Sequence, residues 1–203
     1  GGGGQAWAFR CLDRSRSLQS MKLLHTADWH LGARLQGRSR LPEQHNLLAD
    51  ICGIAERENV DLVVIAGDIF DTYSPPVEAE RLYFETLARL ADGGRRAVAV
   101  IGGNHDSPDR LIASDPIARS HGVITLGRPT DEPGLFDLGS GRIACIESTP
   151  SFARLRVASG STIALILLPY PSESRLFELL SDSIDDEVGA RRNYNDRLRE
   201  ITE

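Results

Sequence analysis

Five side chains that carry oxygen or nitrogen donors follow three separate apolar segments, at the point where each segment ends. Asp28 and His30 follow the first segment, Asp68 the second, and Asn104 and His105 the third. Carboxylate, imidazole and amide groups together suit Mn²⁺, Fe²⁺ or Zn²⁺ better than Ca²⁺. Two such ions about 3.5–4 Å apart neutralise a phosphodiester, activate a water molecule and stabilise the leaving oxygen. The pattern therefore predicts a two-metal phosphoesterase site.

These donors can meet only if the segments before them form neighbouring parallel strands. Residues 22–26, 61–66 and 97–101 are short and apolar, and the second is a β-branched run typical of a strand buried on both faces. Residues 42–58 and 77–91 repeat apolar side chains every three or four positions, which predicts helices. This βαβαβ order implies a mostly parallel sheet covered by helices. Ligands of such sheets bind at the carboxyl ends of the strands.

The second half of the chain carries shorter elements. We expect strands over 123–126, 142–147 and 161–168, a Gly- and Pro-rich loop over 127–141, and partial helix over 109–121.

The two ends differ in composition from the centre. Residues 1–20 open with four glycines and continue with arginines among polar residues, which predicts a disordered tag, linker or upstream extension. Residues 21–203 then form one α/β unit, and its last part, from Glu173 onward, is polar and reads as helical.

The chain resembles the calcineurin-like metallophosphoesterases. Three motifs carry the resemblance: D-x-H at 28–30, G-D-x-x-D at 67–71 and G-N-H-D at 103–106. The residues around the first two motifs are similar to the SbcD branch of DNA nucleases, and the likeness runs from Met21 to about Arg175. It implies an α/β fold, a metallophosphoesterase β-sandwich flanked by helices and apparently truncated. Residues 21–203 would be the N-terminal part of the nuclease domain.

The resemblance also implies a role for each donor. Asp28, His30 and Asp68 would hold one divalent ion, and Asp68 and Asn104 the second, so that Asp68 bridges the two. The most natural pair of ions is Mn²⁺. His105 would bind no metal and would face the scissile phosphate, where it stabilises the transition state or protonates the leaving oxygen.

Three further side chains lie next to these donors. Asp71 stands where other branches of the family often carry His, and its carboxylate is expected to orient the imidazole of His105. Trp29 is expected to pack beneath the site. His25, inside the first predicted strand, is expected to be a packed core residue rather than a ligand.

The family completes its site with three further histidines, one in a TGH-like segment and two in a GHxH motif. After His105 the sequence contains only His121 and no GHxH motif. We therefore expect each ion to be short of some of its protein ligands, and this chain to bind metal weakly and cleave slowly.

The implied activity is double-strand exonuclease and single-strand endonuclease cleavage of DNA, in the processing of ends and hairpins. The implied partners are DNA, an SbcC-type ATPase subunit and a second copy of the chain in a homodimer. Two alternatives stay open: another calcineurin-like phosphodiesterase or phosphatase, and a non-catalytic dimerisation or folding fragment of the nuclease. Cleavage of a DNA hairpin would distinguish the nuclease from the first alternative. A mass measurement in solution together with an activity assay would distinguish it from the second.

Composition sets further limits. The net charge of −6 argues against a surface coated in positive potential, but Arg34, Arg38 and Arg40 form a local basic loop that could contact a phosphate backbone. The three cysteines show no CxxC spacing, which favours free thiols in the cytoplasm. The sequence has no apolar run long enough to span a membrane.

Overall fold

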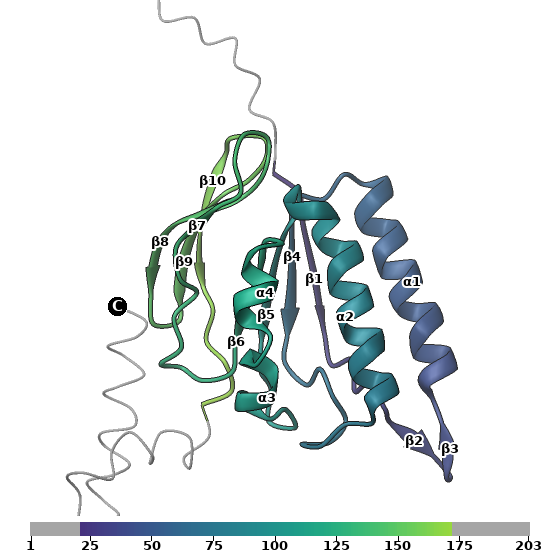
Figure 1. Cartoon of the computed structure of the whole chain (residues 1–203). Helices are drawn as coiled ribbons and strands as arrows, with labels where there is room; N and C mark the ends of the chain where they lie inside the picture. Colours follow the sequence, from purple (N-terminus) through teal and green to yellow (C-terminus); the bar gives the residue numbers. More distant parts are fainter. Residues whose placement is uncertain (1–20, 172–203) are drawn as a thin grey trace, which may run out of the picture.

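The alternating strands and helices of the first half build a parallel sheet. The computed structural model describes residues 21–171, so the predictions for residues 1–20 and for the segment from Glu173 lie outside the described residues. The sheet contains β1 (Leu23–Ala27), β4 (Leu62–Ala66), β5 (Ala97–Ile101) and β6 (Val123–Leu126), in the order β1-β4-β5-β6 (Figure 1). All three strand pairs are parallel, which confirms the predicted βαβαβ order.

Two long helices cover one face of this sheet. They are α1 (Leu41–Arg57) and α2 (Val77–Ala91), which lie side by side in Figure 1. Proline in the first turn of α1 removes an N–H that a helix leaves unpaired there in any case. Helix α2 is followed by Asp92, whose left-handed φ of 50° turns the chain out of the helix into the short 3₁₀ turn η1 (Asp92–Gly94).

A second, antiparallel sheet covers the other face. It contains β7 (Phe136–Asp137), β8 (Ala144–Thr149), β9 (Phe152–Arg156) and β10 (Thr162–Ile166), in the order β10-β9-β8-β7. The short helices α3 (Pro108–Ile112) and α4 (Asp115–Arg119) lie against β6. The predicted α/β fold is confirmed, and Figure 1 shows its layers of helices, parallel sheet and antiparallel sheet.

Alternation along the parallel strands divides the apolar side chains between two cores. On β4, Val63 and Ile65 face α1 and α2, whereas Leu62 faces the second sheet. Burial on both faces explains why this strand is continuously apolar. The sheet is thereby fixed between two layers, and so are the loops at its carboxyl edge.

A buried arginine closes the opposite end of the helical layer. Arg96, 6% exposed, donates to the carbonyls of Ala55 at 3.1 Å, Val60 at 2.9 Å and Leu90 at 2.7 Å. Two of these carbonyls lie in the last turns of α1 and α2, where helices leave carbonyls unpaired. The guanidinium therefore ties both helix ends to the turn that precedes β4.

Several local predictions need correction. β9 was not predicted, β7 lies inside the expected loop over 127–141, and the expected loop after β1 contains the hairpin β2 (Arg34–Leu35) and β3 (Arg38–Ser39). The prediction for His25 was wrong, because its side chain is exposed. His25 is paired with Val64 and so points toward the second sheet. Among residues 21–171, however, the buried core on that side begins at β4 and does not extend over β1, the edge strand of the parallel sheet. Within residues 21–171, no helix has the length and apolar character needed to cross a bilayer.

Candidate metal centre

The three predicted motifs meet at the carboxyl edge of the parallel sheet, the lower edge in Figure 1. Backbone hydrogen bonds join their loops directly. The amide of Asp28 donates to the carbonyl of Gly67 at 3.1 Å, that of His30 to Asp68 at 2.9 Å, and that of Gly67 to Ile101 at 2.9 Å. The loops therefore continue the strand pairing past the strand ends, which fixes the ligand-bearing residues relative to one another.

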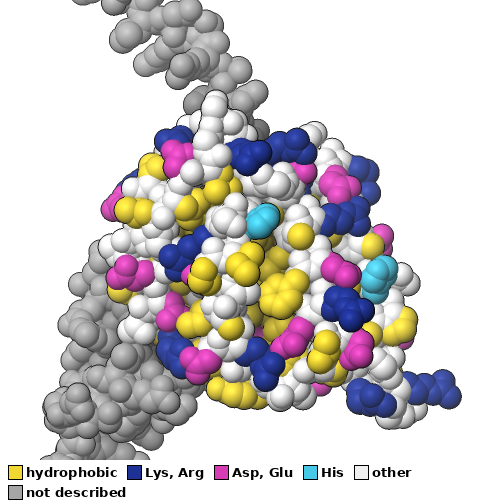
Figure 2. Space-filling model, viewed as in Figure 1, with side chains coloured by type: hydrophobic (Ala, Val, Ile, Leu, Met, Phe, Trp, Pro, Cys, Tyr) yellow, Lys and Arg dark blue, Asp and Glu magenta, His cyan; other side chains and the backbone are white. Residues whose placement is uncertain are grey.

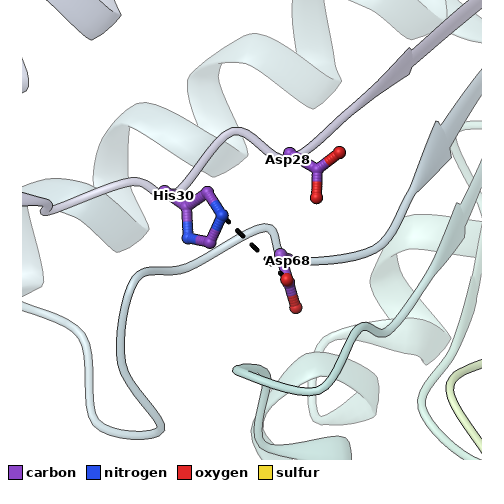
Figure 3. Close-up of side chains that lie close together, drawn as sticks. All are labelled: Asp28, His30 and Asp68. Atoms are coloured by element: carbon purple, nitrogen blue, oxygen red, sulfur yellow. Dashed lines mark ion pairs between the residues drawn. The ribbon is translucent and has the colours of Figure 1, made fainter.

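Three ligand-bearing side chains converge. One ligand atom each from Asp28, His30 and Asp68 lies within 4.8 Å of the others (Figure 3). Nε2 of His30 lies 4.0 Å from Oδ2 of Asp68. Two carboxylates and an imidazole at this spacing are a donor set for a divalent transition metal ion. The structure thus brings together the three residues expected to hold the first ion.

The backbone at these three positions is left-handed. The φ angles of Asp28, His30 and Asp68 are 55°, 44° and 44°. Asp and His tolerate this region better than most residues, but each such residue still costs about 1–3 kcal/mol and persists only where its surroundings hold it there. The sheet edge therefore keeps the candidate ligands in a conformation that an isolated loop would avoid.

The amide of Asn104 faces the same carboxylate. Its side-chain oxygen points at Asp68, and the position it occupies lies 3.1 Å from Oδ2 and 3.3 Å from Oδ1. Oxygen acceptors this close repel one another. Turning the amide would place its NH₂ there and make two hydrogen bonds, and a cation between the oxygens would relieve the repulsion without the turn. In either orientation the side chain of Asn104 lies beside the carboxylate of Asp68, where the second ion was expected.

The carboxylate of Asp71 lies next to His30, whereas it was expected to contact His105. Its carboxylate Oδ1 lies 3.6 Å from Nδ1 of His30, a buried atom that has no hydrogen-bond partner in the described part of the chain. Metal-bound histidines commonly donate their second ring N–H to a carboxylate, which fixes the tautomer and orients the ring. The side chain of Asp71 is placed for that task on His30, whereas the contact of Asp71 with His105 uses its backbone carbonyl.

His105 lies exposed beside the cluster. Its backbone amide donates to Oδ1 of Asp68 at 3.0 Å, and its Nδ1 lies 2.9 Å from the carbonyl oxygen of Asp71. Its ring stands edge-on to that of His30, with ring centroids 5.1 Å apart. The hydrogen bond to Asp71 raises the pKa of His105, and the charge of Asp68 raises it further. The imidazole is thus held at the rim with Nε2 directed away from its anchor.

Asp106, the last residue of the third motif, had no predicted role, whereas Gly103 was expected to allow a close approach of the backbone. The carboxylate of Asp106, 1% exposed, accepts hydrogen bonds from the amides of Ile69 at 3.1 Å, Phe70 at 2.9 Å and Gly103 at 2.8 Å. It therefore ties the second motif to the third. A side chain at Gly103 would overlap the backbone and carboxylate of Asp68. The position of Asp106 directly after Asn104 and His105 was the only signal in the sequence.

The other predicted neighbours also have defined places. Trp29 is 5% exposed and donates from Nε1 to the hydroxyl of Thr26 at 2.9 Å, which confirms that it packs beneath the site. The β2–β3 hairpin projects from this end of the molecule, with its basic side chains prominent at the lower right of Figure 2. Its three arginines are exposed, Arg34 donates to the carbonyl of Gly37, and Arg40 pairs with Glu43 at 3.0 Å.

The chain is similar to known phosphoesterases along most of its length. Residues 21–196 match the family model described as calcineurin-like phosphoesterase. The chain is 42% identical over 183 residues to the SbcD subunit of the nuclease SbcCD from Bacillus subtilis (strain 168), which covers 90% of this chain and 42% of that protein. The protein of the same name from Rhodobacter capsulatus is 43% identical over 119 residues, covering 58% of this chain and 29% of the relative. The protein of that name from Escherichia coli (strain K12) is 42% identical over 97 residues, covering 48% of this chain and 24% of the relative. The chain thus spans about two fifths of the length of the B. subtilis relative, and the matches to the other two cover a smaller share of their lengths.

Proposed function

The chain belongs to the calcineurin-like phosphoesterase family, and we propose on that basis that its site hydrolyses phosphodiesters in DNA as part of a metal-dependent nuclease. The observation that carries the proposal is the convergence of Asp28, His30 and Asp68 within 4.8 Å at the sheet edge. The name of the similar B. subtilis protein, a nuclease subunit, supports a nucleic acid as the substrate. The activities we propose are double-strand exonuclease and single-strand endonuclease cleavage.

The donor set suits two divalent ions, most simply Mn²⁺. Asp28, His30 and Asp68 would hold the first ion, and Asp68 and Asn104 the second. Bound ions would neutralise the phosphate charge and lower the pKa of a water molecule that attacks phosphorus. Asp28 and Asn104 are exposed and the other two half-buried, so the site is open enough for a polymer to reach it.

His105 would act on the leaving oxygen. Because Nδ1 is held by the carbonyl of Asp71, Nε2 is the nitrogen left to face a substrate. The same hydrogen bond raises the pKa of His105, which enlarges the protonated fraction near neutral pH. A protonated Nε2 can stabilise the charge that develops on the phosphoryl group and donate its proton as the P–O bond breaks.

The proposed partners are DNA and two protein chains. The exposed Arg34, Arg38 and Arg40 would contact the DNA backbone, which basic side chains bind without reading sequence. We propose an SbcC-type ATPase as one protein partner, which the name SbcCD of the similar proteins supports. We propose a second copy of the chain as the other. We also propose a cytoplasmic location, in keeping with the free thiols of Cys52 and Cys145.

The salt dependence of binding tests the role of the basic hairpin. Each phosphate contact adds about 0.9 to the slope of log affinity against log salt for duplex DNA. Replacing Arg34, Arg38 and Arg40 together by Gln should therefore reduce the slope by about two to three. A slope equal to that of the unsubstituted chain would remove the hairpin from the DNA-binding surface.

Cleavage of a DNA hairpin tests the function. Long incubations with millimolar Mn²⁺ are appropriate, because the described residues offer only three clustered donors to the first ion. We expect Mn²⁺-dependent cleavage that is lost in Asp68→Asn and reduced about 10²–10⁴-fold in His105→Ala. His121→Ala, which changes an exposed histidine on another loop, is the matched control and should cleave normally.

The outcomes separate the alternatives. Hydrolysis of bis-p-nitrophenyl phosphate without cleavage of the hairpin would point to another calcineurin-like phosphodiesterase. A metal-free, inactive dimer by mass measurement would point to a dimerisation fragment. Undiminished DNA cleavage in His105→Ala would contradict the role given to His105.

A further inference from the structure

A buried glutamine contacts the first ligand loop from helix α1. Gln44 is 7% exposed, although it lies on the buried face of the helix with Leu48, Cys52 and Ala55. Burying an amide costs free energy unless its hydrogen bonds are made. An apolar side chain would be the simpler solution at this position, so the polar group calls for a specific explanation.

The amide makes three hydrogen bonds, all with the backbone of residues 29–32. Oε1 accepts from the amide of Gly32 at 3.1 Å, and Nε2 donates to the carbonyls of Trp29 at 3.3 Å and His30 at 2.7 Å. These bonds use both hydrogens of Nε2 and one lone pair of Oε1. The loop that carries Asp28 and His30 is thus bonded to α1 as well as to the neighbouring strand loop.

The two bonds from Nε2 define the conformation of His30. The Trp29 carbonyl belongs to the peptide plane before His30, and the His30 carbonyl belongs to the plane after it. The φ and ψ angles of His30 describe how these two planes are oriented relative to each other. Successive residues of a strand alternate in direction, so one NH₂ group would not reach both carbonyls there. Here it reaches both, and His30 has a φ of 44°.

We propose that Gln44 is a positioning residue for the metal centre: it holds His30 in the left-handed conformation that brings the imidazole to Asp68. This role deepens the proposed function and rests on it for the metal. A left-handed backbone costs about 1–3 kcal/mol, and without Gln44 fewer hydrogen bonds would offset this cost at His30. His30 would then spend more time in conformations that turn its ring from Asp68.

Mn²⁺ alone is the probe for the test, with the whole chain. Gln44→Met keeps the length of the side chain and removes all three hydrogen bonds. We expect its dissociation constant for Mn²⁺, measured by calorimetry, to rise about 10- to 100-fold, the usual effect of losing a group that orients a metal ligand. Amide hydrogen exchange at Gly32 in the metal-free protein should also become faster.

Leu48→Ala is the matched control, because Leu48 lies on the same face of α1 and is 2% exposed. It weakens the packing of the helix without touching the ligand loop, so it should keep its Mn²⁺ affinity within about twofold. Urea titration identifies a temperature at which both variants are fully folded. If Gln44→Met does not fold, Gln44→Glu preserves the acceptor for Gly32, removes both donors and should show the same loss.

Three results would overturn the inference: normal Mn²⁺ affinity in both Gln44 variants, an equal loss in Leu48→Ala, or no Mn²⁺ binding by the unsubstituted chain. Failure of the nuclease proposal looks different. An unsubstituted chain that binds Mn²⁺ but leaves the DNA hairpin intact contradicts the nuclease function alone, and a weakened Gln44→Met would still support the positioning role.

Discussion

Replacing Asp106 should destabilise the protein more than its place in a loop suggests. The buried carboxylate accepts from the amides of Ile69, Phe70 and Gly103. Hydrogen bonds to a charged group contribute about 1.5–3 kcal/mol each, so three of them set an upper range of roughly 4.5–9 kcal/mol. Water entering the space left by Asp106→Ala would satisfy some of the donors. We therefore expect that variant to lose about 3–5 kcal/mol of unfolding free energy.

The isosteric Asp106→Asn should fall between wild type and alanine. Oδ2 of Asp106 accepts from Ile69 and Gly103, and Oδ1 accepts from Phe70. The single oxygen of asparagine can replace one of these acceptors, while its NH₂ group would face an N–H donor. The variant loses the charge and at least one hydrogen bond, which corresponds to about 2 kcal/mol.

Asp109→Ala is the matched control for this series. Asp109 lies in the same segment, its side chain is 74% exposed, and it pairs with Arg128 at 2.9 Å. Exposed ion pairs contribute about 1 kcal/mol or less. Urea unfolding followed by circular dichroism gives the free energies, provided the m-values agree. A loss below about 1 kcal/mol in Asp106→Ala, or one no larger than in Asp109→Ala, would show that the buried carboxylate does not hold the two motifs together, since changes of that size are ordinary for surface residues.

Two other changes have outcomes that follow from local geometry. Gly103→Ala places a methyl group against Asp68, so it should cost about 1–3 kcal/mol in urea unfolding and weaken Mn²⁺ binding in calorimetry. Unchanged binding would mean that the Asp68 loop is free to move. Burial raises the pKa of the Cys52 thiol, so less thiolate is present at pH 8, and a thiol reagent should modify Cys52 at least about tenfold faster after unfolding. Equal rates in the folded and unfolded protein would contradict its burial.

Topology explains why most of the site could be predicted. Once three strands are interpreted as parallel neighbours, their carboxyl ends must share an edge, and Asp28, Asp68 and Asn104 come together without any knowledge of side-chain packing. β9 was missed although its signal is present. Ala153 and Leu155 are buried while Arg154 and Arg156 are half-buried, which is the period-two pattern of a strand.

Other features depend on contacts that no local pattern encodes. His25 is exposed because of where the second sheet ends, which is a tertiary property. The residue type of Asp71 suggested a carboxylate contact with His105, but the structure uses its carbonyl for that contact and turns its carboxylate to His30. Gln44 did leave a trace in the sequence, as a polar residue in line with Leu48 on an otherwise apolar helix face.

The parallel order of the sheet also determines when in folding the site can exist. Asp28, Asp68 and Asn104 lie on segments separated by whole helices, so no two of the three loops are close until the crossovers α1 and α2 have formed. Such long-range pairings form late and slowly. An ion that binds only after the carboxyl edge of the sheet has folded would stabilise the native state by mass action and leave the folding barrier unchanged. Its kinetic effect would therefore fall on the unfolding rate, so the metal would prolong the lifetime of the native protein without hastening its formation.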